Sequence, residues 1–246
     1  MKKHLLFLVT IIVFLACKQE INVKPDNKTT IVKKTLAPII IDGKTTETIW
    51  QEVNWHKINQ NWLGDNYTEE DFKGQYKLTW DEKALYALVE IQDDILYDQY
   101  KDPLKLWWDD DCVEVFIDED NSGGEHQYNH NAFAYHVALD GNVVDIAPGE
   151  IPTLYNNHVQ SKRITNGKSS IWELKINIHT ADFVDGAQNT PITLHTNKKL
   201  GFAIAYCDND ASLERENFIG SEIVEGKDKN RGWIDASIFG TLLLKG

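Results

Sequence analysis

The segment QYKLTWDEKALYALVEIQDD, residues 75–94, decides the fold class. Apolar side chains recur at every second position at Tyr76, Leu78 and Trp80, and again at Leu85, Ala87, Val89 and Ile91, on either side of the polar turn at residues 81–83. A period of two residues is typical of β-strands that bury one face. The segment therefore predicts a β-hairpin whose apolar face lies in the core.

The same period recurs along the chain, and the sequence shows no long helical stripe. The pair Asp140–Gly141 favours a tight hairpin turn, because both central residues of such a turn need positive φ. One short helix is expected at residues 180–189. The pattern indicates an all-β, antiparallel fold, with further strands at Cys112–Asp118, Ala132–Leu139, Ile171–His179, Phe202–Cys207 and Thr241–Leu244.

Three of these strands have one face of large apolar residues and a second face of mostly small ones. The second face of strands 132–139 and 202–207 carries alanines, with His136 and Cys207 among them. In strand 112–118 the second face carries Glu114. If the three strands adjoin, this face lines a hollow that could hold a ligand. An ordinary second packing layer explains the pattern equally well.

Residues 1–16 have the layout of a signal peptide: Lys2 and Lys3, then an apolar run that ends at Ala16. The run is shorter than the about 20 residues that a membrane-spanning helix needs. The triplet that ends in Cys17 resembles a lipobox, so we expect lipidation of Cys17 after cleavage. Lys18 beside it resembles the sorting pattern of outer-membrane lipoproteins, which predicts a location at the cell envelope.

Residues 17–37 are polar and aperiodic, as expected of a tether, and residues 38–246 are expected to form one domain. The chain has 25 basic and 38 acidic residues and a net charge of −13 at pH 7. This acidity argues against nucleic acid as a partner and leaves the lipid anchor as the only predicted contact with the membrane. Cys112 and Cys207 cannot by themselves form a disulfide framework or a zinc site. One bridge and two buried thiols are equally consistent with the sequence.

Six segments occur in the order and roughly the spacing of family 9 carbohydrate-binding modules. The resemblance runs from Ile39 to the C-terminus and implies a two-sheet β-sandwich, immunoglobulin-like or jelly-roll-like, that binds oligo- or polysaccharide and is not an enzyme. A glycan-degrading enzyme encoded nearby is then an expected partner. The segments are IDGKTTETIW (41–50), LTWDEKALYALVEIQDD (78–94), WWDDDCVEVFIDEDN (107–121), IWELKINI (171–178), GFAIAYCDND (201–210) and GWIDASIFG (232–240).

The resemblance implies that a sugar is clamped between Trp108 and Trp233. Pyranose rings have apolar C–H faces that pack on aromatic planes. A lone tryptophan is more often a core residue than a ligand platform. We therefore place the tryptophans of the regular strands, Trp80 and Trp172, in the core, and the sequence leaves Trp62 and Trp107 open.

Polar partners of the sugar carry over only in part. Glu114 resembles the family's hydroxyl-binding glutamate, and His136 falls at or beside an arginine of the family. An asparagine and a glutamine of the family fall at Ala138 and Ala205, so two hydroxyl anchors are missing. A structural lipoprotein with a degenerate sugar site is therefore an alternative.

Histidines and asparagines cluster in HQYNHNAFAYH, residues 126–136. Their spacing matches no standard metal set, and a sugar-contacting or solvated loop is expected. Related folds carry haem, often with a methionine ligand. Met1 is the only methionine and lies in the predicted signal, which excludes that ligation. A bis-histidine variant, in a haem-binding electron-transfer domain, remains an alternative, although no haem is expected.

Acidic residues gather in several short runs, which suit calcium because this ion takes six to eight oxygen ligands. The family resemblance implies structural calcium, although solvated acidic turns are the default for each run. Asp110 and Glu114 could form a glycosidase pair, but pairs are weak signals in so acidic a chain. The runs are Asp93 and Asp94, Asp109 to Asp111, Asp118 to Asp120, and Asp208 with Asp210.

Overall fold

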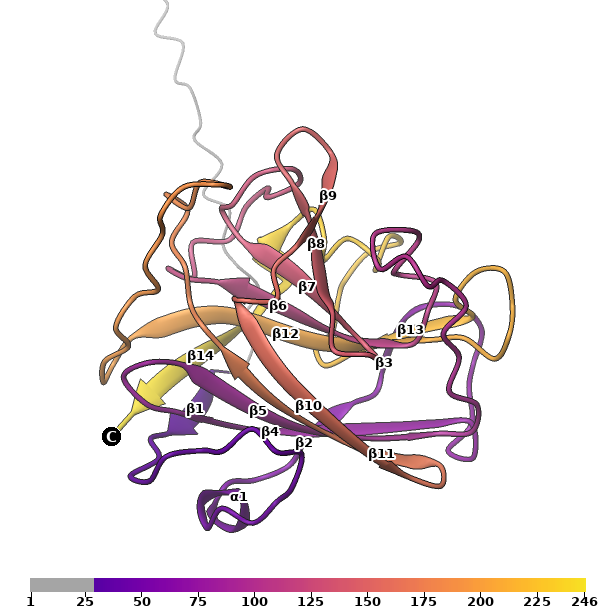
Figure 1. Ribbon diagram of the computed structural model, residues 1–246, viewed down its shortest axis with the longest axis horizontal. Helices are drawn as coiled ribbons and strands as arrows, with labels where there is room; N and C mark the ends of the chain where they lie inside the picture. Colours follow the sequence, from indigo (N-terminus) through magenta and orange to yellow (C-terminus); the bar gives the residue numbers. More distant parts are fainter. Residues whose placement is uncertain (1–28) are drawn as a thin grey trace, which may run out of the picture.

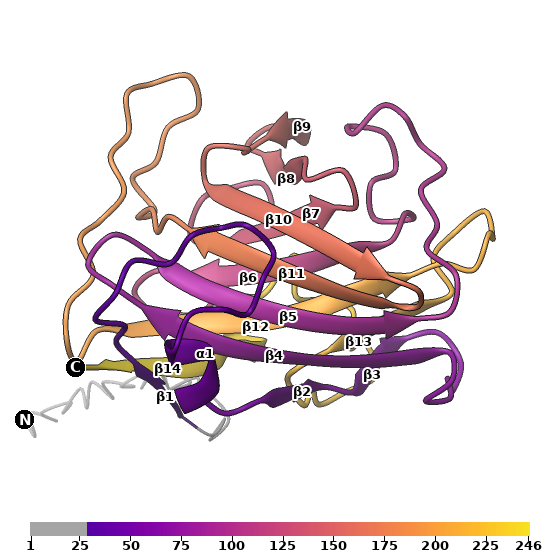
Figure 2. The ribbon, with the colours of Figure 1, turned by 60° about the horizontal axis from the view of Figure 1, so that its bottom comes forward.

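The computed structural model describes residues 29–246 as two β-sheets packed face to face (Figures 1 and 2). The predicted signal at residues 1–16, Cys17 and the tether up to residue 28 lie outside the described part of the chain. Among residues 29–246, no helix has the length and apolar character required to cross a membrane. The two-sheet arrangement confirms the predicted antiparallel β-sandwich.

One sheet contains nine strands and the other five. The larger follows the order β1 (Thr30–Lys33), β14 (Gly240–Lys245), β12 (Lys199–Asp208), β6 (Cys112–Asp118), β7 (Phe133–Ala138), β8 (Val143–Ala147) and β9 (Ile151–Leu154), with β13 (Asn217–Gly220) beside β12 and β3 (Gln60–Leu63) beside β13. The smaller follows the order β10 (Val159–Asn166), β11 (Ser169–Ile176), β5 (Leu85–Asp93), β4 (Phe72–Trp80) and β2 (His56–Ile58). The short helices are α1 (Ile49–Glu52) and the 3-10 turn η1 (Ala236–Ile238).

The predicted hairpin is formed by β4 and β5, which pair in antiparallel register from Phe72 opposite Asp93 to Trp80 opposite Leu85. The carboxylate of Asp81 accepts hydrogen bonds from the backbone N–H groups of residues 83 and 84 and so closes the turn. The apolar face of the hairpin packs against the larger sheet. The strand pattern of residues 75–94 is thereby confirmed.

The main core lies between the sheets and contains the large apolar faces predicted for β6, β7 and β12. Trp80 and Trp172 are 1% exposed within it, as expected. A second cluster lies on the outer face of the smaller sheet, where α1 is found (Figure 2). In this cluster Trp50 of α1 packs with Tyr86 and Leu88 of β5. The outer face of the larger sheet carries a third cluster and is the face with small residues.

Two predictions are wrong. Residues 30–33, expected in the tether, form β1, which pairs in parallel with β14 and buries Val32, so the folded domain begins before residue 38. Residues 180–189 form turns and no helix. There the side chain of Asn189 bonds to the backbone N–H and carbonyl of Val184, which competes with helical hydrogen bonds.

Candidate functional site

The face with small residues is continuous, because β12, β6 and β7 are neighbours in the larger sheet. Glu114 of β6 stands opposite His136 of β7 on one side and Ala205 of β12 on the other. The alternation therefore brings together an acid, a histidine and several alanines, as the sequence suggested. Trp62, left open by the sequence, packs into the same cluster, and its indole N–H donates to the carbonyl of Glu222 at 2.8 Å.

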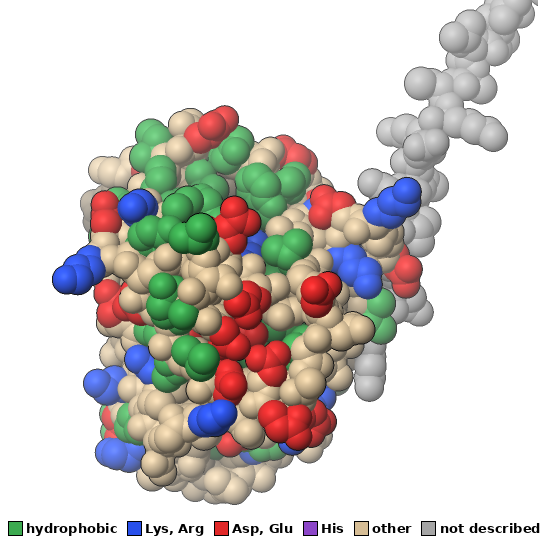
Figure 3. All heavy atoms as spheres, turned by 90° about the vertical axis from the view of Figure 1, so that its right-hand side faces the viewer, with side chains coloured by type: hydrophobic (Ala, Val, Ile, Leu, Met, Phe, Trp, Pro, Cys, Tyr) green, Lys and Arg blue, Asp and Glu red, His purple; other side chains and the backbone are tan. Residues whose placement is uncertain are grey.

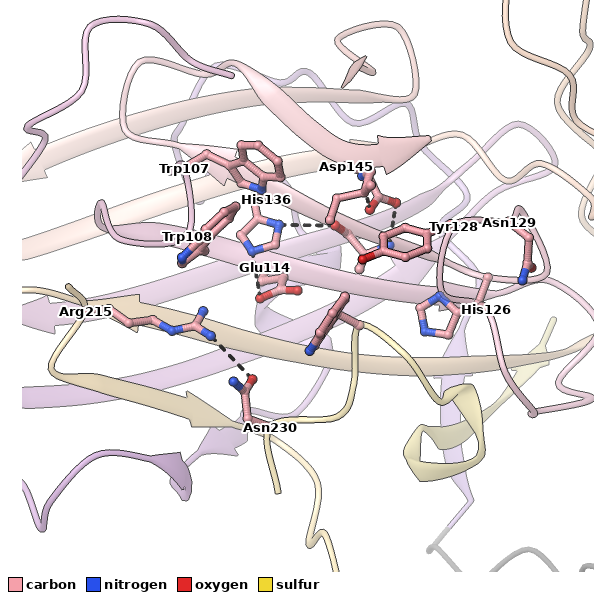
Figure 4. A pocket seen from close by; sticks show the side chains of 14 residues that line it. Trp107, Trp108, Glu114, His126, Tyr128, Asn129, His136, Asp145, Arg215 and Asn230 are labelled. Carbon is pink, nitrogen blue, oxygen red and sulfur yellow. Dashed lines mark hydrogen bonds and ion pairs between the residues drawn. The ribbon is translucent and has the colours of Figure 1, made fainter. Parts of the chain in front are cut away.

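A pocket of about 350 Å³ opens over this face (Figure 4). Its volume lies in the range of small-molecule sites. The four residues predicted to hold the sugar, Trp108, Trp233, Glu114 and His136, all line it. The other lining residues are Trp107, His126, Tyr128, Asn129, Ala132, Ala134, Asp145, Ile146, Arg215 and Asn230.

Trp108 is half-buried and comes from the loop that precedes β6. The loop turns at Leu106, whose φ of 48° is unusual for a residue with a side chain. The buried ring of Trp107 meets that of Trp108 edge to face at 4.8 Å and reaches His136 at 6.2 Å. Asn209, the residue after β12, fixes this loop, because its side-chain N–H donates to the carbonyl of Asp109 at 2.6 Å. Trp108 thus stands on a braced loop.

Trp233 is also half-buried and lies just before η1. The buried ring of His126 supports this segment, because its Nε2 lies 2.7 Å from the carbonyl oxygen of Gly232. Burial lowers the pKa of His126, so the neutral ring donates its Nε2–H. Tyr128, in left-handed backbone with φ of 58°, places its ring 6.4 Å from that of Trp233. The β6–β7 loop and the segment before β14 therefore form the second wall together.

The pocket floor holds an acid–histidine pair. Nε2 of His136 lies 3.1 Å from a carboxylate oxygen of Glu114, and both residues are buried. Burial alone would lower the pKa of His136, but the neighbouring Glu114 and Cys207 outweigh it and raise this pKa to about 10. Burial raises the pKa of Glu114. At neutral pH the floor therefore offers a hydrogen-bonded polar pair among apolar side chains.

Sequence reasoning missed three polar residues that line the pocket, namely Arg215, Asn230 and Asp145. Arg215, on the loop after β12, donates from Nη1 to Sγ of Cys207 at 3.1 Å and from Nη2 to Asn230 at 3.4 Å. Asp145 of β8 accepts backbone N–H bonds from Ala134 and Ile146, and burial raises its pKa to about 7. No period or motif marked these residues, because each belongs to a loop or a short strand.

Two groups suggested by the sequence do not assemble. His126 and His136 line the pocket, whereas His130 lies elsewhere and pairs with Asp185 at 2.8 Å. Asp110 is absent from the pocket lining and accepts backbone N–H bonds from residues 99 and 100. The glycosidase pair of Asp110 and Glu114 is therefore not formed.

Three acids from separate strands and loops converge away from the pocket. Asp93, Asp111 and Asp208 are buried, and one carboxylate oxygen from each lies within 4.8 Å of the others. Burial and mutual repulsion raise the pKa of Asp111 to about 10 and that of Asp208 to about 8. Asp71, Asp94 and Asp210 form a second, more exposed group. Acidic side chains gather in the middle of the face shown in Figure 3.

Cys112 and Cys207 are free thiols in the structure, buried directly opposite each other on β6 and β12. This arrangement corresponds to the two-thiol alternative. Cys112 also lies 3.9 Å from the carbonyl oxygen of Trp107, beneath the pocket wall.

Comparison with known protein families assigns the domain that carries the pocket to a family. A family model described as "Carbohydrate family 9 binding domain-like" matches residues 41–246. The chain belongs to this family. Family 9 domains are non-catalytic carbohydrate-binding modules, which agrees with the expectation of a binding protein rather than an enzyme.

Relatives of this family 9 chain include much longer enzymes. It is 27% identical over 209 residues to exoglucanase XynX of Acetivibrio thermocellus, which covers 84% of this chain and 16% of the relative. A match to endo-1,4-beta-xylanase A of Thermotoga maritima is 33% identical over 85 residues and covers 33% of this chain and 7% of the relative. The chain thus spans a small part of the length of these enzymes.

Solved structures show the same fold. A family 9 module from Caldicellulosiruptor kristjanssonii in complex with cellotriose has a TM-score of 0.68 at 22% identity, covering 89% of this chain and 94% of that one. A putative carbohydrate-binding protein from Bacteroides uniformis has a TM-score of 0.55 at 12% identity, covering 89% and 100%.

Proposed function

We propose that this domain binds a neutral oligo- or polysaccharide in the pocket between Trp108 and Trp233 and does not cleave it. The observation that carries the proposal is the meeting of two half-buried tryptophans, from segments far apart in sequence, over a floor with a buried polar pair. Aromatic planes match the apolar faces of a pyranose ring, and the polar groups match its hydroxyls.

Glu114 and His136 are the proposed hydroxyl partners. Figure 4 shows them between Trp108 on one side and Tyr128 on the other, so that a ring entering the pocket meets the polar pair. Arg215 and Asn230 add donors and an amide from a further wall. Ala138 and Ala205 do not line the pocket, and the polar contacts that Arg215 and Asn230 offer argue against a degenerate site.

Glucose and cellotriose are the first ligands to test, because the similar solved modules are described as complexes with these sugars. Binding is followed by calorimetry and by tryptophan fluorescence. Replacing Trp108 or Trp233 by alanine should each weaken binding by about 1–3 kcal/mol, or about 5- to 150-fold. Trp55→Ala is the matched control, since Trp55 is 37% exposed and does not line the pocket.

A response that survives both pocket substitutions would place the sugar elsewhere. Failure of every neutral sugar on a glycan array to bind the wild-type domain would remove the proposed function.

We further propose that calcium stabilises the fold at Asp93, Asp111 and Asp208. Their carboxylates fit a hard cation, because three buried acids converge and repel one another. Backbone N–H groups of Tyr97 and Asn209 already bond to Asp111 and orient its carboxylate. The ion would join the last residues of β5 and β12 to the residue that precedes β6.

We also propose that Cys17 is lipidated and anchors the domain at the cell envelope, in the outer membrane, where it holds a glycan for a separate degrading enzyme. The support is the sequence of residues 1–18 and the relatives, in which the matching segment is a minor part of a long exoglucanase or xylanase chain. Labelling of cells with radioactive palmitate should mark the wild-type protein, and Cys17→Ser should abolish the label. Label that persists in the variant would contradict the anchor.

A further inference from the structure

Beneath the pocket floor, the structure brings together two cysteines and a histidine that are far apart in sequence. Cys112 of β6, His136 of β7 and Cys207 of β12 each place one ligand atom within 4.8 Å of the others. All three are buried, with the sulfur residues at most 1% exposed. Three adjoining strands of one sheet hold them, so their relative positions are set by the backbone ladder.

The donor set is that of a zinc site. Thiolate and imidazole are the preferred zinc ligands, and two cysteines with one histidine form a recognised three-residue set. In tetrahedral geometry these ligand atoms lie about 3.4–3.8 Å apart, which small side-chain rotations can reach from the observed spacing.

The histidine is oriented for such a role. Nδ1 of His136 lies 3.3 Å from the carbonyl oxygen of Ala134, and Nε2 points toward Glu114. A metal-bound histidine commonly donates its other ring N–H to a carbonyl or carboxylate, which selects the nitrogen that binds the ion. Here the bond to Ala134 leaves Nε2 for the metal. The carboxylate of Glu114, 3.1 Å from Nε2, stands next to the fourth position.

The surrounding charges suit a divalent cation. Sγ of Cys207 accepts a hydrogen bond from Nη1 of Arg215 at 3.1 Å, so a cationic side chain already stands beside this sulfur. Two thiolates and the Glu114 carboxylate together would balance a divalent ion and the guanidinium of Arg215. A buried site is tolerated when its charges cancel in this way.

We propose that Cys112, His136 and Cys207 form a zinc-binding site under the floor of the pocket, with Glu114 beside the open coordination position. The ion enters through the pocket, which His136 and Glu114 line. As it binds, the protons held by the two thiols and by Nε2 of His136 leave to solvent. The site does not depend on sugar binding, although the two share His136.

The test uses the full chain with Cys17→Ser, so that Cys112 and Cys207 are the two remaining cysteines of the sequence. The protein is reduced, freed of metal, and titrated with zinc against a chromophoric chelator, with no sugar present. We expect one zinc per chain. Cobalt added in place of zinc should give the sulfur-to-cobalt charge-transfer band of thiolate coordination, which reports the ligands without any pocket mutation.

Cys112→Ser, Cys207→Ser and His136→Gln should each weaken zinc binding by more than about 100-fold, the upper range for loss of a group that only supports a ligand. His195→Gln, at an exposed histidine, is the matched control and should leave the affinity unchanged. Circular dichroism confirms that each variant is folded.

Stoichiometry well below one, a missing cobalt–thiolate band, or affinity that survives both cysteine substitutions would each overturn the site. A Cys112–Cys207 disulfide that resists mild reduction would do the same. Sugar titration of the metal-free protein is a separate measurement, so a failed zinc site and a failed sugar site can be told apart.

Discussion

We expect His158 to make the stability of this domain depend on pH. It is fully buried and belongs to the loop that connects β9 to β10, and its Nδ1 lies 2.8 Å from the hydroxyl of Tyr135, which donates to it. Nε2 has no hydrogen-bond partner within residues 29–246. The ring stacks on that of His179, with centroids 4.1 Å apart. The neutral ring therefore carries its proton on Nε2, and a second proton would have to enter on Nδ1, in place of the hydrogen bond that Tyr135 donates.

Burial, reinforced by the neighbouring His179 and His130, lowers the pKa of His158 from 6.5 to about 3. Asp185 acts in the opposite direction but does not outweigh burial. Because the folded protein binds this proton less tightly than the unfolded chain, the stabilisation is complete above pH 6.5 and is lost as the pH falls toward 3. The ionisable side chains in ring or hydrogen-bond contact around this site are Tyr135, Tyr155, His130, His179 and Asp185.

The magnitude follows from the two pKa values. Between pH 8 and pH 5, a histidine with pKa 6.5 in the unfolded chain and about 3 in the folded protein lowers the free energy of unfolding by about 2 kcal/mol. We expect His158→Gln to remove this part of the pH dependence. The amide does not titrate in this range and retains a polar group near Tyr135.

Urea unfolding of the wild type and of His158→Gln at both pH values measures the difference directly. The pH-independent effect of the substitution cancels when the change in free energy of unfolding between the two pH values is compared. The contributions of acidic residues that both proteins share cancel as well. His195→Gln, at an exposed position, should keep the wild-type pH dependence. Equal loss of stability on acidification in the wild type and in His158→Gln would refute the reasoning.

Two further predictions concern the fold. A Cβ at Gly220 would lie 2.1 Å from the ring of Trp62, so Gly220→Ala should lower the free energy of unfolding by about 1–3 kcal/mol; urea midpoints unchanged from wild type would contradict this packing. Calcium at about 100 times its Kd should add about 2.7 kcal/mol of stability. In thermal unfolding with calcium or with chelator, Asp111→Asn should lose this gain, and a variant that still responds fully would place the ion away from Asp93, Asp111 and Asp208.

Local periodicity was sufficient for the central strands. In β4, β5, β6, β7 and β12 one face packs against the opposite sheet, so apolar side chains are required at every second position of the sequence. Edge strands lack that signal. β10 exposes most of its residues, and β1 buries one side chain of four, so neither was recognised.

The candidate site likewise contains residues that the sequence predicted and residues that it did not. Family resemblance and strand alternation named Trp108, Trp233, Glu114 and His136, which the structure gathers in one pocket. Arg215 escaped prediction because it lies on an irregular loop with no pattern of its own.

The sequence by itself determined antiparallel β structure, its core faces and the face of small residues, because these follow from side chains spaced two residues apart on one strand. The two-sheet sandwich was implied by the family resemblance. Only the tertiary structure decided which strands adjoin. The order β12, β6, β7 places Cys207, Cys112 and His136 within reach of one another. Neighbours in a sheet are chosen by long-range pairing and packing, which local spacing does not encode.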